Sequence, residues 1–256
     1  MAKRLMIMSQ KGGVSKTTST VVTAEILAEA GYKVLVVDLD TQGNATQMLT
    51  GSSIYKYSGR SVMEAIKERN AGEYMVQTKE NLYVLPAEDM LATFSRYIYT
   101  SQIKEPLKVI KRTLEPIEDD FDYIFLDCPP NLGDIVLNAV IYVDYVIVPV
   151  DSGAFALDAL SRFIDFINGA KEEGHTQAEV LGVLMTMKDT RSNHEKDIAE
   201  EVRDEYKSLV FDAEIRKRAK IKEMALSGVD LSSREHLMVI EDYLKFVEEV
   251  IERVNK

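Results

Sequence analysis

The chain has 256 residues, of which 46% are hydrophobic and 29% charged, values typical of a globular protein and not of a disordered or fibrous one. Its 42 acidic residues exceed its 31 basic residues by 11, which argues against a protein built wholly as a nucleic-acid coat. The single cysteine, Cys128, excludes an internal disulfide and a cluster that needs several thiolates from one chain, and no apolar run reaches the roughly 18 residues that span a bilayer.

Short apolar runs alternate along the chain with longer amphipathic stretches. The runs predict strands at residues 4–9, 33–39, 82–86, 123–127, 145–150 and 181–186, with a weaker one at 209–213. The amphipathic stretches predict helices at 17–30, 62–69, 102–114, 134–143, 156–173, 195–207 and 236–254, and residues 50–61 read as a loop. Several strands are apolar on both faces, as in parallel strands covered by helices on each side. We therefore predict an α/β fold, a doubly wound, mainly parallel sheet flanked by helices, in one domain over residues 1–256.

The first predicted strand is followed by a glycine-containing turn, Gln10-Lys-Gly-Gly-Val-Ser-Lys-Thr-Thr18, that opens the first predicted helix. Backbone N–H groups of such a turn converge on phosphate oxygens, and the helix N-terminus adds a partial positive charge. Lys16 would reach the β- and γ-phosphates, and the Thr17 hydroxyl would bind Mg²⁺. The pattern G-x-x-x-x-G-K-[ST] fails here, whereas the variant K-G-G-x-x-K-[ST] fits, with Lys11 at its start. The alternative is a turn that merely caps a helix.

Carboxylates follow two further predicted strands at their carboxyl ends. Asp38 and Asp40 follow the second strand, and Asp127 ends the fourth. Ligands of an open parallel sheet bind beyond the carboxyl ends of its strands, so these side chains should converge on the Lys16 turn. Phosphoryl transfer needs a bound metal and a group that positions the attacking water, and Asp38 and Asp127 would hold Mg²⁺ through water. Each aspartate alone would also suit a helix cap or a turn.

Together these motifs resemble the ParA/MinD group of deviant P-loop ATPases, over about residues 3–187. The resemblance implies that the chain binds ATP and Mg²⁺, that Asp40 orients the lytic water, and that Asp127 is the Walker-B aspartate. It places the adenine near the strand that ends at Met187. It also implies that Lys11 and Lys16, together with Asp40, are catalytic residues. Ser15 and Thr41 stand where the group usually has glycine and proline. The residues expected to bind the nucleotide are Lys11, Gly12, Gly13, Val14, Ser15, Lys16, Thr17, Thr18 and Met187, and those expected to hold the metal are Thr17, Asp38 and Asp127.

Lys11 is a second lysine in a turn where one suffices to neutralise bound phosphates. The resemblance implies that it crosses a twofold interface and contacts the phosphates held by a partner subunit. ATP would then supply charge-assisted bonds that exist only in a homodimer. The alternative is a solvated lysine.

A basic run, Arg216-Lys-Arg-Ala-Lys-Ile-Lys222, places five basic residues in seven near the end of the chain. At helical spacing its lysines and arginines pair on shared faces. Phosphate contacts need only positive charge, and the resemblance implies nonspecific DNA binding by this part in the ATP state. The alternative is a solvated basic helix face. The DNA-binding candidates are Arg216, Lys217, Arg218, Lys220 and Lys222.

The resemblance to ParA further implies a cytoplasmic, nucleoid-associated protein that partitions plasmid or chromosomal DNA with a ParB-type centromere-binding partner. A MinD-like positioning ATPase and a metabolic ATP-dependent ligase on the same scaffold remain as alternatives. The predicted last helix speaks against membrane binding, because residues 235–256 hold six acidic residues against three lysines and arginines, which anionic lipid would repel. We expect that helix to pack on the sheet. No additional catalytic cluster indicates a ligase, and the first residues lack the features of a signal peptide.

Overall fold

A single eight-stranded sheet forms the centre of the computed structural model, which describes residues 1–153, 155–188, 193–218 and 234–256. Its order is β3-β4-β2-β5-β1-β6-β7-β8, and every neighbouring pair is parallel except β3 and β4. The predicted doubly wound, mainly parallel sheet is therefore confirmed. The strands are β1 (Lys3–Ile7), β2 (Val34–Asp38), β3 (Val76–Lys79), β4 (Leu82–Leu85), β5 (Tyr123–Asp127), β6 (Tyr145–Asp151), β7 (Glu179–Lys188) and β8 (Val210–Arg216).

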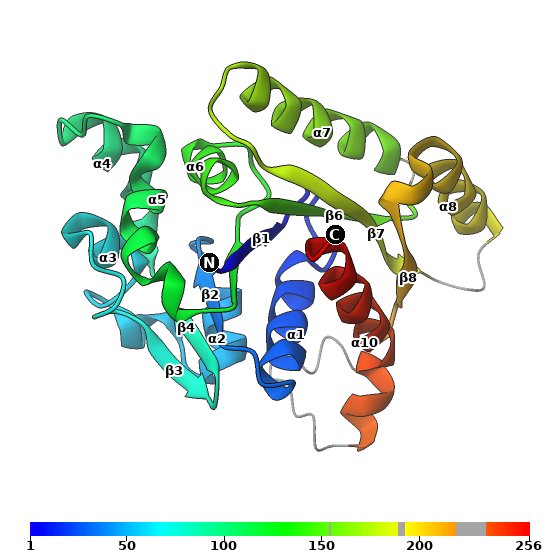
Figure 1. Ribbon diagram of the computed structural model, residues 1–256, viewed down its shortest axis with the longest axis horizontal. Helices are drawn as coiled ribbons and strands as arrows, with labels where there is room; N and C mark the ends of the chain where they lie inside the picture. The colour runs from blue at the N-terminus through cyan, green and yellow to red at the C-terminus, as the bar shows by residue number, and fades with distance from the viewer. Residues whose placement is uncertain (154, 189–192, 219–233) are drawn as a thin grey trace.

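Helices cover both faces of the sheet (Figure 1). One face is covered by α1 (Lys16–Glu29), α2 (Asn44–Thr50) and α10 (Arg234–Val254). The other is covered by α3 (Val62–Glu68), α4 (Phe94–Thr100), α5 (Val109–Leu114), α6 (Asp134–Tyr142), α7 (Ala156–Glu172) and α8 (Asn193–Tyr206). Because both faces are covered, all five residues of β2 and all five of β5 are buried, which explains their continuous apolar sequences.

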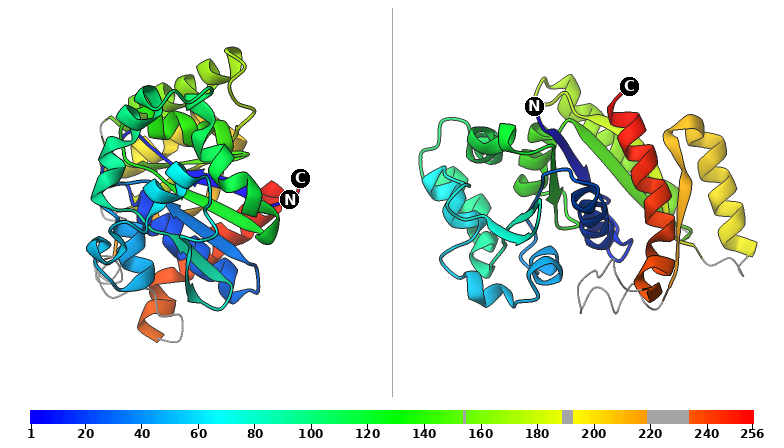
Figure 2. Two further views of the ribbon diagram at one scale, coloured as in Figure 1. Left: turned by 90° about the vertical axis from the view of Figure 1, so that its left-hand side faces the viewer. Right: turned by 60° about the horizontal axis from the view of Figure 1, so that its bottom comes forward.

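The last helix, α10, packs on the sheet as expected. Phe246 and Val250 are fully buried in the core on the α1 side, and the Tyr243 hydroxyl lies 3.2 Å from the Ser19 hydroxyl of α1. The two ends of the chain lie side by side, where the Lys3 ammonium donates to the Val254 carbonyl at 2.7 Å (Figure 2). Within the described residues, no helix is both long enough and apolar enough to cross a bilayer.

Several local predictions were incomplete, and the short helices α2 and α4 were not predicted. The strand β3 went unpredicted because it is a short, polar edge strand, joined to β4 by a tight turn in which Asn81 has φ 61°. The expected loop at 50–61 holds a 3₁₀ turn, Ile54–Tyr57, because the Ile54 side chain packs closely over Gly43. The expected helix at 102–114 is helical only over its second half, where a 3₁₀ turn that begins at Pro106 leads into α5.

Candidate functional site

The turn between β1 and α1 lies at the carboxyl edge of the sheet and opens directly into the helix. Gly13 has φ 80° and Ser15 has φ 63°, so both adopt the left-handed conformation. For a serine this costs about 1–2 kcal/mol, which explains why glycine is the commoner residue at such a position. No side chain caps the N-terminus of α1. Its first N–H groups are therefore free of a side-chain acceptor at the place where a phosphate would bind.

Lys16 folds back over this turn, and its ammonium donates to the Lys11 carbonyl at 2.9 Å. The residue is only 8% exposed, and no other lysine whose exposure the structure describes is buried. Burial lowers the pKa of Lys16, whereas the negative charges of Asp127 and Asp40 oppose that shift. A buried ammonium that faces two carboxylates and a carbonyl is placed to neutralise an incoming polyanion.

Asp127 and Asp38 lie side by side, because they are register partners at the ends of β5 and β2. Asp127 is fully buried, and neither of its carboxylate oxygens has a well-formed hydrogen bond among the described residues, although the Thr17 hydroxyl is close enough to stabilise its charge. Burial, and after it the charge of Asp38, raises the pKa of Asp127 well above its usual range, while Thr17 and Lys16 oppose the rise. An unpartnered buried carboxylate beside a threonine hydroxyl fits Mg²⁺, which needs few protein ligands when phosphates and water supply the rest. No group of three or more His, Cys, Asp or Glu side chains within the described ranges would hold a metal by itself.

Asp38 is as buried as Asp127 but is fully engaged. One of its oxygens accepts from the Thr46 N–H at 2.8 Å and from the Thr46 hydroxyl at 2.7 Å, and the other accepts from the Asp40 N–H at 3.2 Å. The Thr46 hydroxyl in turn accepts from the Ala87 N–H at 2.9 Å. Burial raises the pKa of Asp38 to about 6, although these hydrogen bonds lower it in part. Asp38 thus ties the segment after β2 to the sheet, and its expected contact with a metal stays a prediction.

Asp40 stands in the segment between Asp38 and α2, half-buried at the same edge. One of its oxygens accepts from the Gln42 N–H at 3.0 Å, and its charge acts on both Lys16 and Asp127. The hydrogen bond from Gln42 therefore holds Asp40 close to Lys16 and Asp127, where it can accept a further hydrogen bond. An acceptor of this kind is suited to orient a water molecule.

Lys11 is paired within its own subunit. Its ammonium lies 2.7 Å from Asp151 at the end of β6, and its side chain is 34% exposed. Asp151 is a site residue that our reading of the sequence missed. A carboxylate at the carboxyl end of a parallel strand, the signal that identified Asp38 and Asp127, would also have identified it.

The end of β7 borders the site, because β7 lies next to β6 on the side away from β1. The Thr186 hydroxyl donates to the Val14 carbonyl at 3.2 Å and to the Val150 carbonyl at 3.4 Å, so it fastens the β1–α1 turn to the sheet. Met187 follows with φ 57° and is half-buried. It lies at the predicted edge of the sheet, and its contact with an adenine stays a prediction.

The basic run departs from the prediction. Arg216 is the last residue of β8, so the expected helical spacing is wrong for it. Its guanidinium is held by both carboxylate oxygens of Asp242 at 3.0 Å, and Arg218 lies 4.0 Å from the same carboxylate. Burial would raise the pKa of Asp242, but the hydrogen bonds and charge of Arg216 outweigh it and lower that pKa. The charge of Arg216 is therefore compensated by α10, whereas Arg218 lies only at the limit of an ion pair with the same carboxylate.

Lys217 is the cation of this run that faces outward. It is exposed and has no ion-pair partner among residues 1–153, 155–188, 193–218 and 234–256. Lys220 and Lys222 lie outside the described residues. Of the five expected DNA-binding residues, Lys217 is thus the one that the structure describes as an exposed cation without an ion pair.

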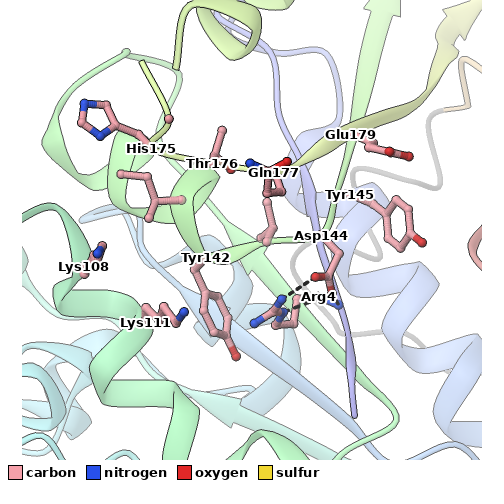
Figure 3. A pocket seen from close by; sticks show the side chains of 13 residues that line it. Arg4, Lys108, Lys111, Tyr142, Asp144, Tyr145, His175, Thr176, Gln177 and Glu179 are labelled. Carbon is pink, nitrogen blue, oxygen red and sulfur yellow. Dashed lines mark hydrogen bonds and ion pairs between the residues drawn. The ribbon is translucent and has the colours of Figure 1, made fainter. Parts of the chain in front are cut away.

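A separate cavity of about 410 Å³ lies at the opposite, amino-terminal edge of the sheet (Figure 3). It is bordered by Asp144 and by the first residues of β6 and β7, Tyr145 and Glu179. Arg4 points toward Asp144 and donates to it from Nε at 3.1 Å. This cavity therefore lies at the edge of the sheet opposite to the β1–α1 turn and is separate from the site described above.

Comparisons with known proteins agree with this geometry. The family model AAA_31, described as an AAA domain, matches residues 2–180. The chain is 34% identical over 231 residues to the sporulation initiation inhibitor protein Soj of Bacillus subtilis, covering 89% of each chain. It is similar in fold to apo McdA of Cyanothece, with a TM-score of 0.85 and 23% identity over 99% of this chain and 100% of that one. It is also similar to cobyrinic acid a,c-diamide synthase from Mycobacterium smegmatis with bound ADP and magnesium, with a TM-score of 0.78 and 31% identity over 88% of this chain and 91% of that one.

Proposed function

Since this chain belongs to the AAA_31 family and is a relative of the Soj/ParA-type ATPases, we propose that it is a Mg²⁺-dependent ATPase that partitions DNA. In this proposal two subunits associate when both hold ATP, and the dimer binds DNA without sequence preference. A ParB-type centromere-binding protein then stimulates hydrolysis and releases the dimer from DNA. The cargo is a plasmid or a chromosome.

One observation carries the ATPase part of the proposal, namely the buried Lys16 ammonium beside the unpartnered Asp127 carboxylate. Thr17 and Asp127 would hold Mg²⁺ when ATP is bound, and the metal would supply positive charge to the phosphate oxygens. Lys16 stabilises the charge that develops on the transferred phosphate, since its ammonium is already directed into the turn. Asp40 accepts a hydrogen bond from the attacking water and so aligns it.

Asp40→Ala is expected to retain ATP binding within about 3-fold and to lower the hydrolysis rate by about 100-fold or more, because it removes only the group that aligns the water. Phosphate release and nucleotide titration measure the two effects separately. Asp119→Ala, which removes an exposed carboxylate elsewhere on the surface, serves as the control. Rapid turnover in Asp40→Ala would exclude this residue from the mechanism.

The DNA-binding part of the proposal rests on Lys217 and is tested by retention of DNA across a salt series. With ATP, the wild-type protein is expected to bind DNA with an affinity that falls steeply with salt. Lys217→Glu should weaken that affinity by about 10-fold at low salt and reduce the salt dependence, while ATP turnover without DNA is unchanged.

Lys104→Glu is the matched control, since it makes the same change of charge at another exposed lysine. Equal DNA binding by the two variants would contradict the role of Lys217. Equal retention with ATP and with ADP would contradict nucleotide-controlled DNA binding as a whole.

A metabolic ligase is the second candidate, and the 31% identity to cobyrinic acid a,c-diamide synthase favours it. A ligase would consume ATP only together with a carboxylate and an amine donor, and DNA would not alter its affinity for ATP. Nucleotide-dependent DNA retention therefore separates the two functions. A MinD-like membrane role is the less favoured alternative, because Phe246, Val247 and Val250 of α10 are buried against the sheet.

A further inference from the structure

The ion pair between Lys11 and Asp151 joins two parts of the site that are 140 residues apart in the sequence. The ammonium of Lys11 lies 2.7 Å from one carboxylate oxygen, and the two side chains are 34% and 25% exposed. Both are therefore partly withdrawn from solvent. The pair spans from the β1–α1 turn to the end of β6, the neighbouring strand in the sheet.

The backbone after β6 closes over this pair. A Cβ atom placed on Gly153 would lie 2.6 Å from the Lys11 ammonium and 3.4 Å from each Asp151 oxygen. A side chain at Gly153 would therefore require the Lys11 ammonium to shift, which the flexible lysine side chain can do. Glycine at this position leaves room for the ammonium beside Asp151.

Lys11 also fixes the other lysine of the turn. Its carbonyl accepts the hydrogen bond of Lys16, while its side chain is bound by Asp151. If the Lys11 side chain moved away from Asp151, the Asp151 carboxylate would lose its ion pair next to the expected phosphate site. The β1–α1 turn, whose Lys11 carbonyl accepts from Lys16, would lose one of its contacts to β6.

The resemblance to the ParA/MinD group implies that Lys11 contacts phosphates across a dimer, whereas its ammonium here lies 2.7 Å from Asp151 of its own subunit. From this geometry we propose that Asp151 is a positioning residue that retains Lys11 within its own subunit and so opposes dimerisation. A triphosphate held by a twin subunit carries more negative charge than one carboxylate and displaces Asp151. Loss of the terminal phosphate weakens that competitor, and Lys11 then returns to Asp151. The inference rests on the proposed function.

Asp151→Asn is expected to shift ATP-dependent dimerisation to about 5- to 20-fold lower protein concentration, measured by sedimentation. The shift is larger than for one surface ion pair because a twofold dimer must break two of them. Gly153→Ala is a second, independent variant with the same expected direction, since its methyl group displaces the ammonium without changing a charge.

The double variant Lys11→Ala/Asp151→Asn is the control and should dimerise no better than Lys11→Ala alone. Dimerisation of Asp151→Asn at the wild-type concentration would overturn the proposal. A need for higher concentration would also overturn it, because Asp151 would then assist the dimer.

A second measurement uses the nucleotide-free protein and does not depend on dimerisation. Acetic anhydride labelling of Lys11, quantified by mass spectrometry, is expected to be about 3-fold faster in Asp151→Asn than in wild type, because an ammonium held in an ion pair is protected. Lys104, which is exposed, should label equally in both proteins. If Lys11 labels faster in Asp151→Asn but the wild-type protein forms no dimer with ATP, the wild-type ion pair is supported and only the proposed function is contradicted. Equal labelling of Lys11 would contradict the inference.

Discussion

Lys16→Ala is expected to weaken ATP binding by about 100-fold or more, because truncating one partner of a buried charge interaction costs about 2–5 kcal/mol. Lys16 is 8% exposed and faces Asp127 and Asp40, so its removal leaves two carboxylates at the place where the phosphates must bind. The loss of affinity therefore has two parts: the attraction of Lys16 for the phosphates is missing, and the repulsion of the phosphates by Asp127 and Asp40 is no longer compensated. Isothermal titration with ATP and Mg²⁺ measures it.

Lys171→Ala is a suitable control, since it removes a half-buried lysine from the last turn of α7, away from the β1–α1 turn. Its ATP affinity should match that of the wild-type protein. Circular dichroism of Lys16→Ala establishes that the variant is folded. A folded Lys16→Ala protein that binds ATP within about 3-fold of wild type would remove this lysine from the site.

Asp127→Asn is expected to abolish hydrolysis and yet to stabilise the protein without nucleotide and Mg²⁺. The folded state raises the pKa of Asp127, so between its ordinary pKa and the raised value the folded protein binds more protons than the unfolded chain. Stability consequently falls as pH rises through that window. Asparagine removes the group whose ionised form this buried position disfavours, so the Tm of the variant should exceed that of the wild-type protein at pH 7.5.

The pH dependence of this gain provides the first test. At pH 4 the wild-type carboxyl of Asp127 is largely protonated in the folded state, so the difference in Tm between the two proteins should shrink. Addition of Mg²⁺ and ATP should raise the Tm of the wild-type protein more than that of the variant. A lower Tm for Asp127→Asn than for wild type at pH 7.5 would contradict the assignment of a buried unpartnered charge.

Asp38→Asn is the matched control, because Asp38 is equally buried and lies in register with Asp127. Its two oxygens accept from Thr46 and from the Asp40 N–H, and asparagine keeps only one acceptor oxygen, because an amide NH₂ cannot accept. We expect this lost hydrogen bond to outweigh the gain from removing a carboxylate whose pKa burial raises to about 6. We therefore expect this variant to be destabilised. Two substitutions of the same chemistry, on neighbouring strand ends, should change Tm in opposite directions.

The sequence was sufficient to predict every strand of the sheet except β3, and the sheet's carboxyl edge, because these depend on local patterns. Strands such as β2 are apolar on both faces over their whole length, and the side chain that ends a parallel strand has a fixed place at the edge. Asp38 and Asp127 were placed correctly at that edge for this reason. Their different hydrogen bonding was beyond prediction, since it depends on where Thr46 lies after the chain turns into α2.

Interactions between distant segments account for the remaining differences. The basic run was read as a set of free charges because its neighbours in sequence are basic, whereas Asp242 reaches Arg216 from α10. For Lys11 the sequence suggested a contact across a twofold interface or a solvated side chain, since Asp151 becomes its neighbour only through the register of β6 beside β1. Charge counted along a sequence does not reveal which charges are already paired by the fold.

Ser15 has a consequence for the free energy of folding. Its left-handed conformation costs about 1–2 kcal/mol for a residue with a side chain, and the folded state must supply that free energy from its other interactions. A chain with this serine therefore gives up some resistance to unfolding to hold the β1–α1 turn in this shape.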